Sequence, residues 1–508
     1  TMMSKAATLS SLLAISLFAC GKSDDSGDKG KKGQTGEATA ETAKKTAAPT
    51  PAPAPSKAAK PSAAPPLPAD TGEHSGDLVL AKGLGSDDTD SARALALDGE
   101  GNIILAGYYK GKSFAGSEHG SADGEPDAFV AKLDPKGVAQ WIVPLGGAGV
   151  DAAEAVATDS QGNAIVVGSF GTELQVGDGK IDAAGADDMF IGKFAADGRR
   201  LWVKRVGGKD IDAAQSVIAD ADGNIYVTGV YRNEVLFADT TLKSEGDADI
   251  FILKYSPEGE QLWVKHFGAI GADYGRDLAI DSEGNLILLS EISFAVDLGG
   301  GPLSTNGNRD IALAKFDKDG NHLWSKSMGN NFDDIGMSVA VDPADNVLIT
   351  GSFEGEVKYG DAELKAVRRS DLFVAKFDSM GELTWAKAYG GKDKDWGNSI
   401  ATDSKGNAYI TGWFWFTLKL GAFELTSKGK EDVFLLKMSP AGEPLWAKSF
   451  GNTSLDMGKA VAVDKNDGVV TVGAFNNELD IDGTKLTPTV GEDPRIVKGD
   501  IYLGIFGR

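Results

Sequence analysis

Aspartates recur along this chain at a fixed spacing, and they are its most regular chemistry-bearing residues. The first member of each pair lies at Asp90, Asp151, Asp212, Asp273, Asp334, Asp395 and Asp456. The second member follows eight residues later, from Asp98 in the first copy to Asp464 in the last. Carboxylates gathered at one place bind metal ions or cationic ligands, and paired carboxylates hydrolyse glycosides. The spacing of 61 residues, held over seven copies, means that these residues belong to a repeat architecture.

The repetition itself favours a structural role for both sets of aspartates, because a single site seldom needs sevenfold identity. We expect each first aspartate to accept backbone N–H bonds and to fasten a loop to its blade. Each second aspartate precedes a Gly-Asn type of turn, where Asx hydrogen bonding is common. Asp220-Ala-Asp-Gly-Asn224 resembles a calcium loop but lacks the closing Glu and the twelve-residue length. The sequence therefore predicts no metal and no cofactor. A cation bound where the first aspartates would surround the mouth of a central channel remains an alternative.

Each 61-residue unit carries four strand signals separated by turns. In the first unit the expected strands are 94–97, 103–107, 127–132 and a last one around Trp141. Short apolar runs bounded by Gly, Asp, Asn and Pro are typical of strands joined by hairpins. Four antiparallel strands per unit, repeated evenly, predict a β-propeller. Lysines recur inside the third strands, from Lys132 to Lys437, and we expect them to pair with the repeated carboxylates, since a buried unpaired ammonium is costly.

The two ends of the repeat array indicate a closed ring. Tryptophan marks the last strand of units one to six, and the seventh unit stops one strand short. Residues 77–85 align with that missing strand, with Leu80 in the Trp position. An N-terminal strand that completes the last blade removes the exposed sheet edges. The sequence thus predicts an all-β, closed seven-bladed β-propeller over residues 77–508, with the Trp strands outermost and the aspartate strands innermost.

The motifs D-x-x-G-N-x-x-x-x-G and D-x-F-x-x-K-x-D-x-x-G-x-x-x-W resemble those of the bacterial seven-bladed β-propeller repeat family, often called SBBP. The resemblance covers about 430 of the 508 residues, and it implies a secreted or surface-attached propeller with no common catalytic activity. Ala312 replaces the Phe of the pattern, Ser290 the Gly and Ile505 the Lys. Unit seven also carries extra residues before Asp500, and an irregular closing blade is expected there.

Unit six departs from its siblings by three tryptophans. Trp413 and Trp415 lie in the run Trp413-Phe-Trp-Phe416, and Trp396 follows Asp395. We expect all three to point to the face that carries the loops between blades. Exposed tryptophans stack on sugars or anchor protein partners. The alternative is that they fill gaps between blades.

The N-terminal part predicts export and lipid anchoring. Residues 1–19 carry an apolar run that is too short to span a bilayer and fits a signal peptide. The run ends in Leu17-Phe-Ala-Cys20, which resembles the lipobox of bacterial lipoproteins, with Phe18 in place of a small residue. Cys20 is the single cysteine of the chain. Residues 20–76, rich in Pro, Ala and Lys, predict a disordered tether. An exported protein, lipid-anchored to the bacterial cell envelope at its outer membrane, is expected.

Charge and motifs narrow the function classes. A formal net charge of -23 argues against a nucleic-acid partner, because phosphate recognition needs clustered Lys and Arg. No P-loop, G-x-S-x-G or H-E-x-x-H motif is present. The favoured hypothesis is a monomeric, non-catalytic propeller that presents a binding face to a protein or glycan and touches the membrane through its lipid anchor only. A secreted polysaccharide hydrolase or lyase with carboxylates at the channel mouth, and a structural envelope component, are the alternatives.

Overall fold

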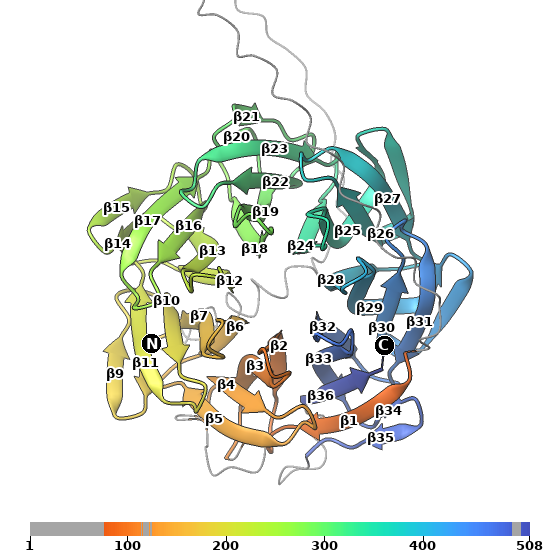
Figure 1. The fold of residues 1–508 in the computed structure, drawn as a ribbon, viewed down its shortest axis with the longest axis horizontal. Coiled ribbons are helices and arrows are strands. Elements are labelled where there is room, and N and C mark those ends of the chain that lie inside the picture. Colours follow the sequence, from red (N-terminus) through yellow and green to blue (C-terminus); the bar gives the residue numbers. More distant parts are fainter. Residues whose placement is uncertain (1–75, 113, 115–120, 122–123, 490–498, 508) are drawn as a thin grey trace, which may run out of the picture. The chain divides into compact units, whose positions relative to one another are not determined.

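The computed structural model describes residues 76–112, 114, 121, 124–489 and 499–507. The predicted signal peptide, the lipidated Cys20 and the tether lie outside these residues, apart from Gly76. In the described part of the chain, no helix has the length and apolar character needed to cross a membrane. The described residues form seven four-stranded antiparallel sheets that surround a common centre, so the predicted seven-bladed propeller is confirmed (Figure 1).

The strands of each blade keep the same order from the centre outward. The innermost strands are β2 (Ser91–Leu97), β6 (Ala152–Thr158), β12 (Ala213–Ala219), β18 (Tyr274–Ile280), β24 (Ile335–Val341), β28 (Asp395–Thr402) and β32 (Asp456–Val463). The second strands are β3 (Ile103–Tyr109), β7 (Ala164–Phe170), β13 (Ile225–Tyr231), β19 (Leu286–Ile292), β25 (Val347–Tyr359), β29 (Ala408–Leu420) and β33 (Val469–Asn476). We number the blades one to seven in the order of these innermost strands.

The outer half of each blade holds the motif lysines and tryptophans. The third strands are β4 (Asp127–Leu133), β10 (Asp188–Phe194), β16 (Asp249–Tyr255), β22 (Asp310–Phe316), β26 (Ala362–Phe377), β30 (Phe423–Met438) and β36 (Gly499–Phe506). The outermost strands are β5 (Ala139–Leu145), β11 (Arg200–Val206), β17 (Gln261–Phe267), β23 (His322–Met328), β27 (Leu383–Tyr389), β31 (Pro444–Phe450) and β1 (Leu78–Leu84). The Trp strands are outermost, as the sequence predicts.

In blades two to seven, the described connections between second and third strands form additional hairpins. Four of them are separate two-stranded sheets, formed by β8 (Glu173–Val176) with β9 (Gly179–Asp182), β14 (Glu234–Phe237) with β15 (Thr240–Lys243), β20 (Val296–Asp297) with β21 (Pro302–Leu303), and β34 (Leu479–Ile481) with β35 (Thr484–Leu486). In blades five and six the hairpin continues the long strands of the blade itself. Hairpin side chains such as Val235 and Leu418 are buried in the blade cores.

Blade seven closes the ring with strands from both ends of the chain. Its order is β1-β36-β33-β32, and β1 runs antiparallel to β36 from Leu78 opposite Phe506 to Leu84 opposite Ile501. This arrangement confirms the predicted N-terminal closing strand. The inserted residues 490–498 lie outside the described residues, and the described part of blade seven is a regular four-stranded sheet.

The repeated Gly of the second strand has a steric cause. A Cβ added at Gly168 would lie 2.0 Å from the carbonyl oxygen of Ala152 on the innermost strand, and the distance at Gly412 to Trp396 is 1.9 Å. Only glycine, which has no Cβ, fits where the two backbones approach so closely. Blade four has Ser290 instead, whose hydroxyl donates to the carbonyl of Ala312, and the opposing residue is there a glycine, Gly275.

Candidate functional site

The seven first aspartates fasten the loops that enter each blade. Asp151 accepts backbone N–H bonds from Gly147 at 2.8 Å and from Gly171 at 3.1 Å. Asp212, Asp273 and Asp456 accept the equivalent pair, and all seven carboxylate-bearing residues are at most 1% exposed. These are the backbone hydrogen bonds that a structural role of the first aspartates requires. The side chains are closed off by the loops they bind.

A further set of buried aspartates, which the sequence reasoning missed, lies in the third strands at the position of Asp127 in the first blade. Its members are Asp127, Asp188, Asp249, Asp310, Asp371, Asp432 and Asp500. Each lies beside a first aspartate of the following blade, as Asp371 lies beside Asp395. Burial, with the charge of Asp371 as a further cause, raises the pKa of Asp395 to about 8. Asp90 beside Asp500 also has a pKa of about 8, again mainly through burial. The signal was present, because an aspartate opens every D-x-F motif.

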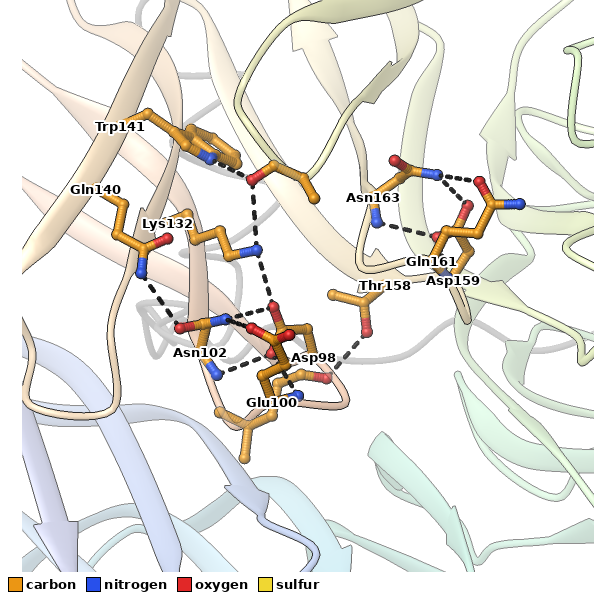
Figure 2. Close-up of polar contacts among 12 residues, drawn as sticks. Asp98, Glu100, Asn102, Lys132, Gln140, Trp141, Thr158, Asp159, Gln161 and Asn163 are labelled. Carbon is orange, nitrogen blue, oxygen red and sulfur yellow. Dashed lines mark hydrogen bonds and ion pairs between the residues drawn. The ribbon is translucent and has the colours of Figure 1, made fainter.

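The turn aspartates bind the motif lysines (Figure 2). Asp98 accepts backbone bonds from Glu100 and Asn102, and Lys132 lies 2.8 Å from its other oxygen. Burial alone would raise the pKa of Asp98, but the bonds from Lys132 and Asn102 lower it below its ordinary value. Trp141 of the outermost strand donates its indole N–H to the carbonyl of Ala196, which belongs to the turn of blade two. The buried ion pair ties two turns of one blade together, and the hydrogen bonds of Lys132 and Trp141 to Ala196 link it to the turn of the next blade.

Blade three departs from this pairing. Tyr226 occupies the place of Ile104 or Ile165, and its hydroxyl donates to Asp220 at 3.2 Å. Lys254 forms no ion pair with Asp220; it lies over the Tyr226 ring and donates to the carbonyl of Lys318 at 2.9 Å. The predicted lysine–carboxylate pair is thus replaced here by a tyrosine hydrogen bond and a cation–π contact.

A β-bulge interrupts the innermost strand of every blade, and the bulged residue is polar in six blades and Met337 in blade five. The bulged, half-buried residues are Arg93, Glu154, Gln215, Arg276, Met337, Asn398 and Lys459. Arg93 pairs with Glu154 of the next blade at 2.6 Å, and Arg276 pairs with the buried Glu291 at 2.8 Å. Burial, together with the charge of Arg93, lowers the pKa of Lys459 to about 8. The bulged position has no repeated residue type, so the period gave no signal for it.

Two of the three predicted ligand-binding tryptophans are core residues. Trp396 and Trp413 are 5% and 6% exposed, and their rings stack with centroids 5.8 Å apart. The Trp396 indole N–H donates to the hydroxyl of Ser370 in blade five at 3.0 Å. The expectation of three tryptophans exposed on one face is therefore wrong for this pair. They fill the gap between blades five and six, which was the alternative interpretation.

The third tryptophan belongs to an aromatic pair at the surface. Trp415 is half-buried, Phe416 is 50% exposed, and their rings are parallel with centroids 5.4 Å apart. Phe416 has a φ of +64°, in the left-handed region that bulky residues avoid. The same position holds Asn233, Gly355 and Asn477 in other blades, also at positive φ. Only Phe294 of blade four repeats the substitution, with a φ of +62° and 60% exposure. Both phenylalanines are thus exposed aromatic residues in a backbone conformation that costs free energy, and in blade six the ring also stacks on a second aromatic residue.

Metal chemistry has no preformed centre in the described residues. No group of three or more His, Cys, Asp or Glu side chains among them is arranged to hold a metal ion. His266 bonds to the hydroxyl of Tyr231 and His322 to that of Ser325, each at 3.0 Å. Both histidines therefore take part in local hydrogen bonds within their blades.

Comparison with known proteins places the repeat in a family. Residues 384–413 match the model of the SBBP beta-propeller repeat, which confirms the resemblance seen in the sequence motifs. The chain is 24% identical over 500 aligned residues to an uncharacterized WD repeat-containing protein of Acanthamoeba polyphaga mimivirus, covering 78% of this chain and 36% of that protein. It is 27% identical to the regulatory protein FlaEY of Caulobacter vibrioides, covering 41% of this chain and 23% of FlaEY. The chain thus spans well under half the length of either relative.

Two solved structures are similar to this chain at low sequence identity. The WD40 β-propeller domain of Doa1 aligns over 85% of this chain and 97% of its own, with 11% identity and a TM-score of 0.43. The polysaccharide lyase Uly1 aligns over 85% and 99%, with 9% identity and a TM-score of 0.44.

Proposed function

We propose, from a seven-bladed propeller that carries the SBBP beta-propeller repeat, that this protein is a non-catalytic binding scaffold of the bacterial cell envelope. It presents one face of the propeller to a glycan or protein. Cys20 carries the lipid that holds it at the outer membrane, and residues 20–76 act as the tether. Several acyl chains on one cysteine supply the strength that stable anchoring needs.

The surface pair Trp415 and Phe416 is the observation that supports a binding role best. A binding face needs side chains that are exposed, rigid and different from the repeat consensus. Phe416 is half-exposed, is held by its stack on Trp415, and keeps a strained backbone that Asn or Gly would relieve.

The alternative of a polysaccharide hydrolase or lyase requires carboxylates that reach a sugar. General acid–base catalysis works within hydrogen-bonding distance of the reacting atoms. The first aspartates are at most 1% exposed, and each is engaged by its own loops, as where Asp151 accepts two backbone N–H bonds and Asp334 and Asp395 accept one. Their raised pKa values come mainly from burial, so they do not single out a catalytic pair.

A binding array tests the proposal. The purified protein is applied to immobilised glycans and peptides, together with the double variant Trp415→Ala, Phe416→Ala. We expect a ligand whose binding falls at least about tenfold in the double variant, because aromatic anchors dominate binding free energies. Phe294→Ala, at the same position of blade four, is the matched control and should bind normally. Unchanged binding in the double variant, or no ligand on any array, would refute the proposal. Loss of lipid labelling in Cys20→Ser tests the anchor.

A further inference from the structure

Blades five and six depart from the repeat in charge as well as in aromatic residues. The three residues that end two positions before the third-strand aspartate are Glu245-Gly-Asp247 in blade three and Asn306-Gly-Asn308 in blade four. They become Val367-Arg-Arg369 in blade five and Lys428-Gly-Lys430 in blade six. The crossing into the innermost strand changes in the same place, from Ile270-Gly-Ala272 in blade four to Lys392-Asp-Lys394 in blade six.

The three basic segments form one surface with the aromatic pair. Arg369 pairs with Asp393 at 3.3 Å, which joins the blade five segment to the crossing. The backbone N–H of Trp415 donates to the carbonyl of Lys394 at 3.2 Å. The N–H of Phe416 donates to the hydroxyl of Ser427, next to Lys428, at 3.0 Å. Each contact links neighbouring segments, so we call residues 367–369, 392–394, 415–416 and 428–431 the basic–aromatic patch.

The basic–aromatic patch is strongly cationic on an acidic protein. It contains six basic residues, namely Arg368, Arg369, Lys392, Lys394, Lys428 and Lys430, and two acidic ones, Asp393 and Glu431. All the basic residues except the half-buried Lys394 are exposed. The whole chain has a formal charge of -23. A local excess of positive charge on an acidic protein attracts anionic ligands to the basic–aromatic patch.

We infer that the basic–aromatic patch binds an acidic polysaccharide, a chain of uronate-type sugars, and this inference rests on the proposed binding function. Sugar rings stack on an exposed aromatic face such as that of Phe416, and their carboxylates pair with Lys and Arg. The charges come from three segments on two blades, so a long chain with a repeated charge meets them together, and its weak contacts add. A membrane surface is less suited, because one half-exposed phenylalanine buries little apolar area in a bilayer.

Binding to polygalacturonate tests the inference. The probes are polygalacturonate, its fully methyl-esterified form, poly-glutamate and vesicles of anionic phospholipid. The test variants are Lys428→Glu with Lys430→Glu and, on the other blade, Arg368→Glu with Arg369→Glu. The matched control is Lys209→Glu with Lys243→Glu, which makes the same charge change on exposed lysines of the loop before blade three and its hairpin. Circular dichroism verifies that each variant is folded.

We expect polygalacturonate to bind the unmodified protein and the control alike. Each test variant should bind it at least about tenfold more weakly, because two attractive charges become repulsive. Binding should weaken with added salt, and the esterified polymer should bind poorly. If poly-glutamate or vesicles bind as strongly as polygalacturonate or more strongly, the inference that the ligand is a polysaccharide is wrong. A neutral glycan or a protein that needs Phe416 but not the charges overturns this inference and leaves the proposed function standing. No binding of any probe or array ligand overturns both.

Discussion

At the scale of single residues, the two strained phenylalanines offer a matched comparison. Phe294→Asn should raise the free energy of unfolding by about 1 kcal/mol, because a bulky side chain costs at least about that much in the left-handed region and Asn tolerates it. Phe416→Asn should give a smaller gain, because it also loses a stack worth about 0.5–1.5 kcal/mol with Trp415. Urea unfolding of both variants measures the difference. Destabilisation by Phe294→Asn would mean that its backbone is not strained.

The tryptophans show where residue-scale prediction from sequence ends. Trp396, Trp413 and Trp415 were recognisable as exceptions because six sibling copies were available for comparison. Their exposure was not recognisable, since it depends on a neighbouring blade. Ser370 of blade five offers a hydroxyl to Trp396, and the two indoles stack on each other at positions where blade two has Ala152 and Ser169. Alternation along a strand does not encode which of two blades a side chain enters.

At the scale of the element, the turn ion pairs should contribute most where Lys and Asp meet directly. Lys193→Met leaves Asp159 buried without its partner at 2.9 Å and should lower the free energy of unfolding by about 3 kcal/mol. Lys254→Met in blade three should cost clearly less, because Tyr226 continues to bond to Asp220. Urea denaturation of the two variants checks this order. Equal losses would show that the lysine stems, rather than the ion pairs, stabilise the blades.

The buried aspartate pairs should make stability depend on pH. The native pKa of Asp90, Asp334 and Asp395 is about 8, against 3.8 for an ordinary aspartate, mainly through burial. A raised native pKa means that the folded state holds protons that the unfolded state releases. The stabilisation is therefore complete below pH 3.8 and is lost as pH rises toward 8, at about 1.4 kcal/mol per pH unit for one group. The turn aspartates act oppositely, since the lowered pKa of Asp159 or Asp281 makes stability fall in acid.

Together these two sets predict maximal stability near pH 4, the ordinary pKa of aspartate, and a decline above it that is still in progress from pH 6 to pH 8. Unfolding free energies measured at both pH values check the decline. Asp395→Asn should make it shallower by removing one titrating group, whereas a substitution at the exposed Asp361 should leave the slope unchanged. Stability that is constant or rises from pH 6 to pH 8 would contradict the buried, protonated pairs.

At the scale of the whole molecule, the fold was predictable because one period encodes every blade. Four strand signals per unit, seven units and a missing last Trp strand determine the ring and its closure by residues 77–85. The site was less predictable, because it depends on what differs between blades. The basic segments at Arg368 and Lys428 become meaningful only when contacts such as Arg369 with Asp393 place them together. The third-strand aspartates, such as Asp371, were visible in the repeat. Their proximity to the first aspartates follows from the packing of adjacent blades.

The closure of blade seven gives the prediction for the whole ring. A protein that starts at Gly85 lacks β1, so the outer edge of β36 loses its partner from Ile501 to Phe506. The buried Leu84 alone contributes about 1.5–3 kcal/mol, and Leu78 and Ala81 pack against the same blade. We expect a lower urea midpoint and association of copies through the unpaired edge, measured by light scattering. A protein that starts at Gly76 keeps β1 and is the control. Adding a peptide of residues 77–85 should restore the midpoint, because the peptide can pair with the free edge of β36. An unchanged midpoint in the truncated protein would mean that the other strands hold the ring closed without β1.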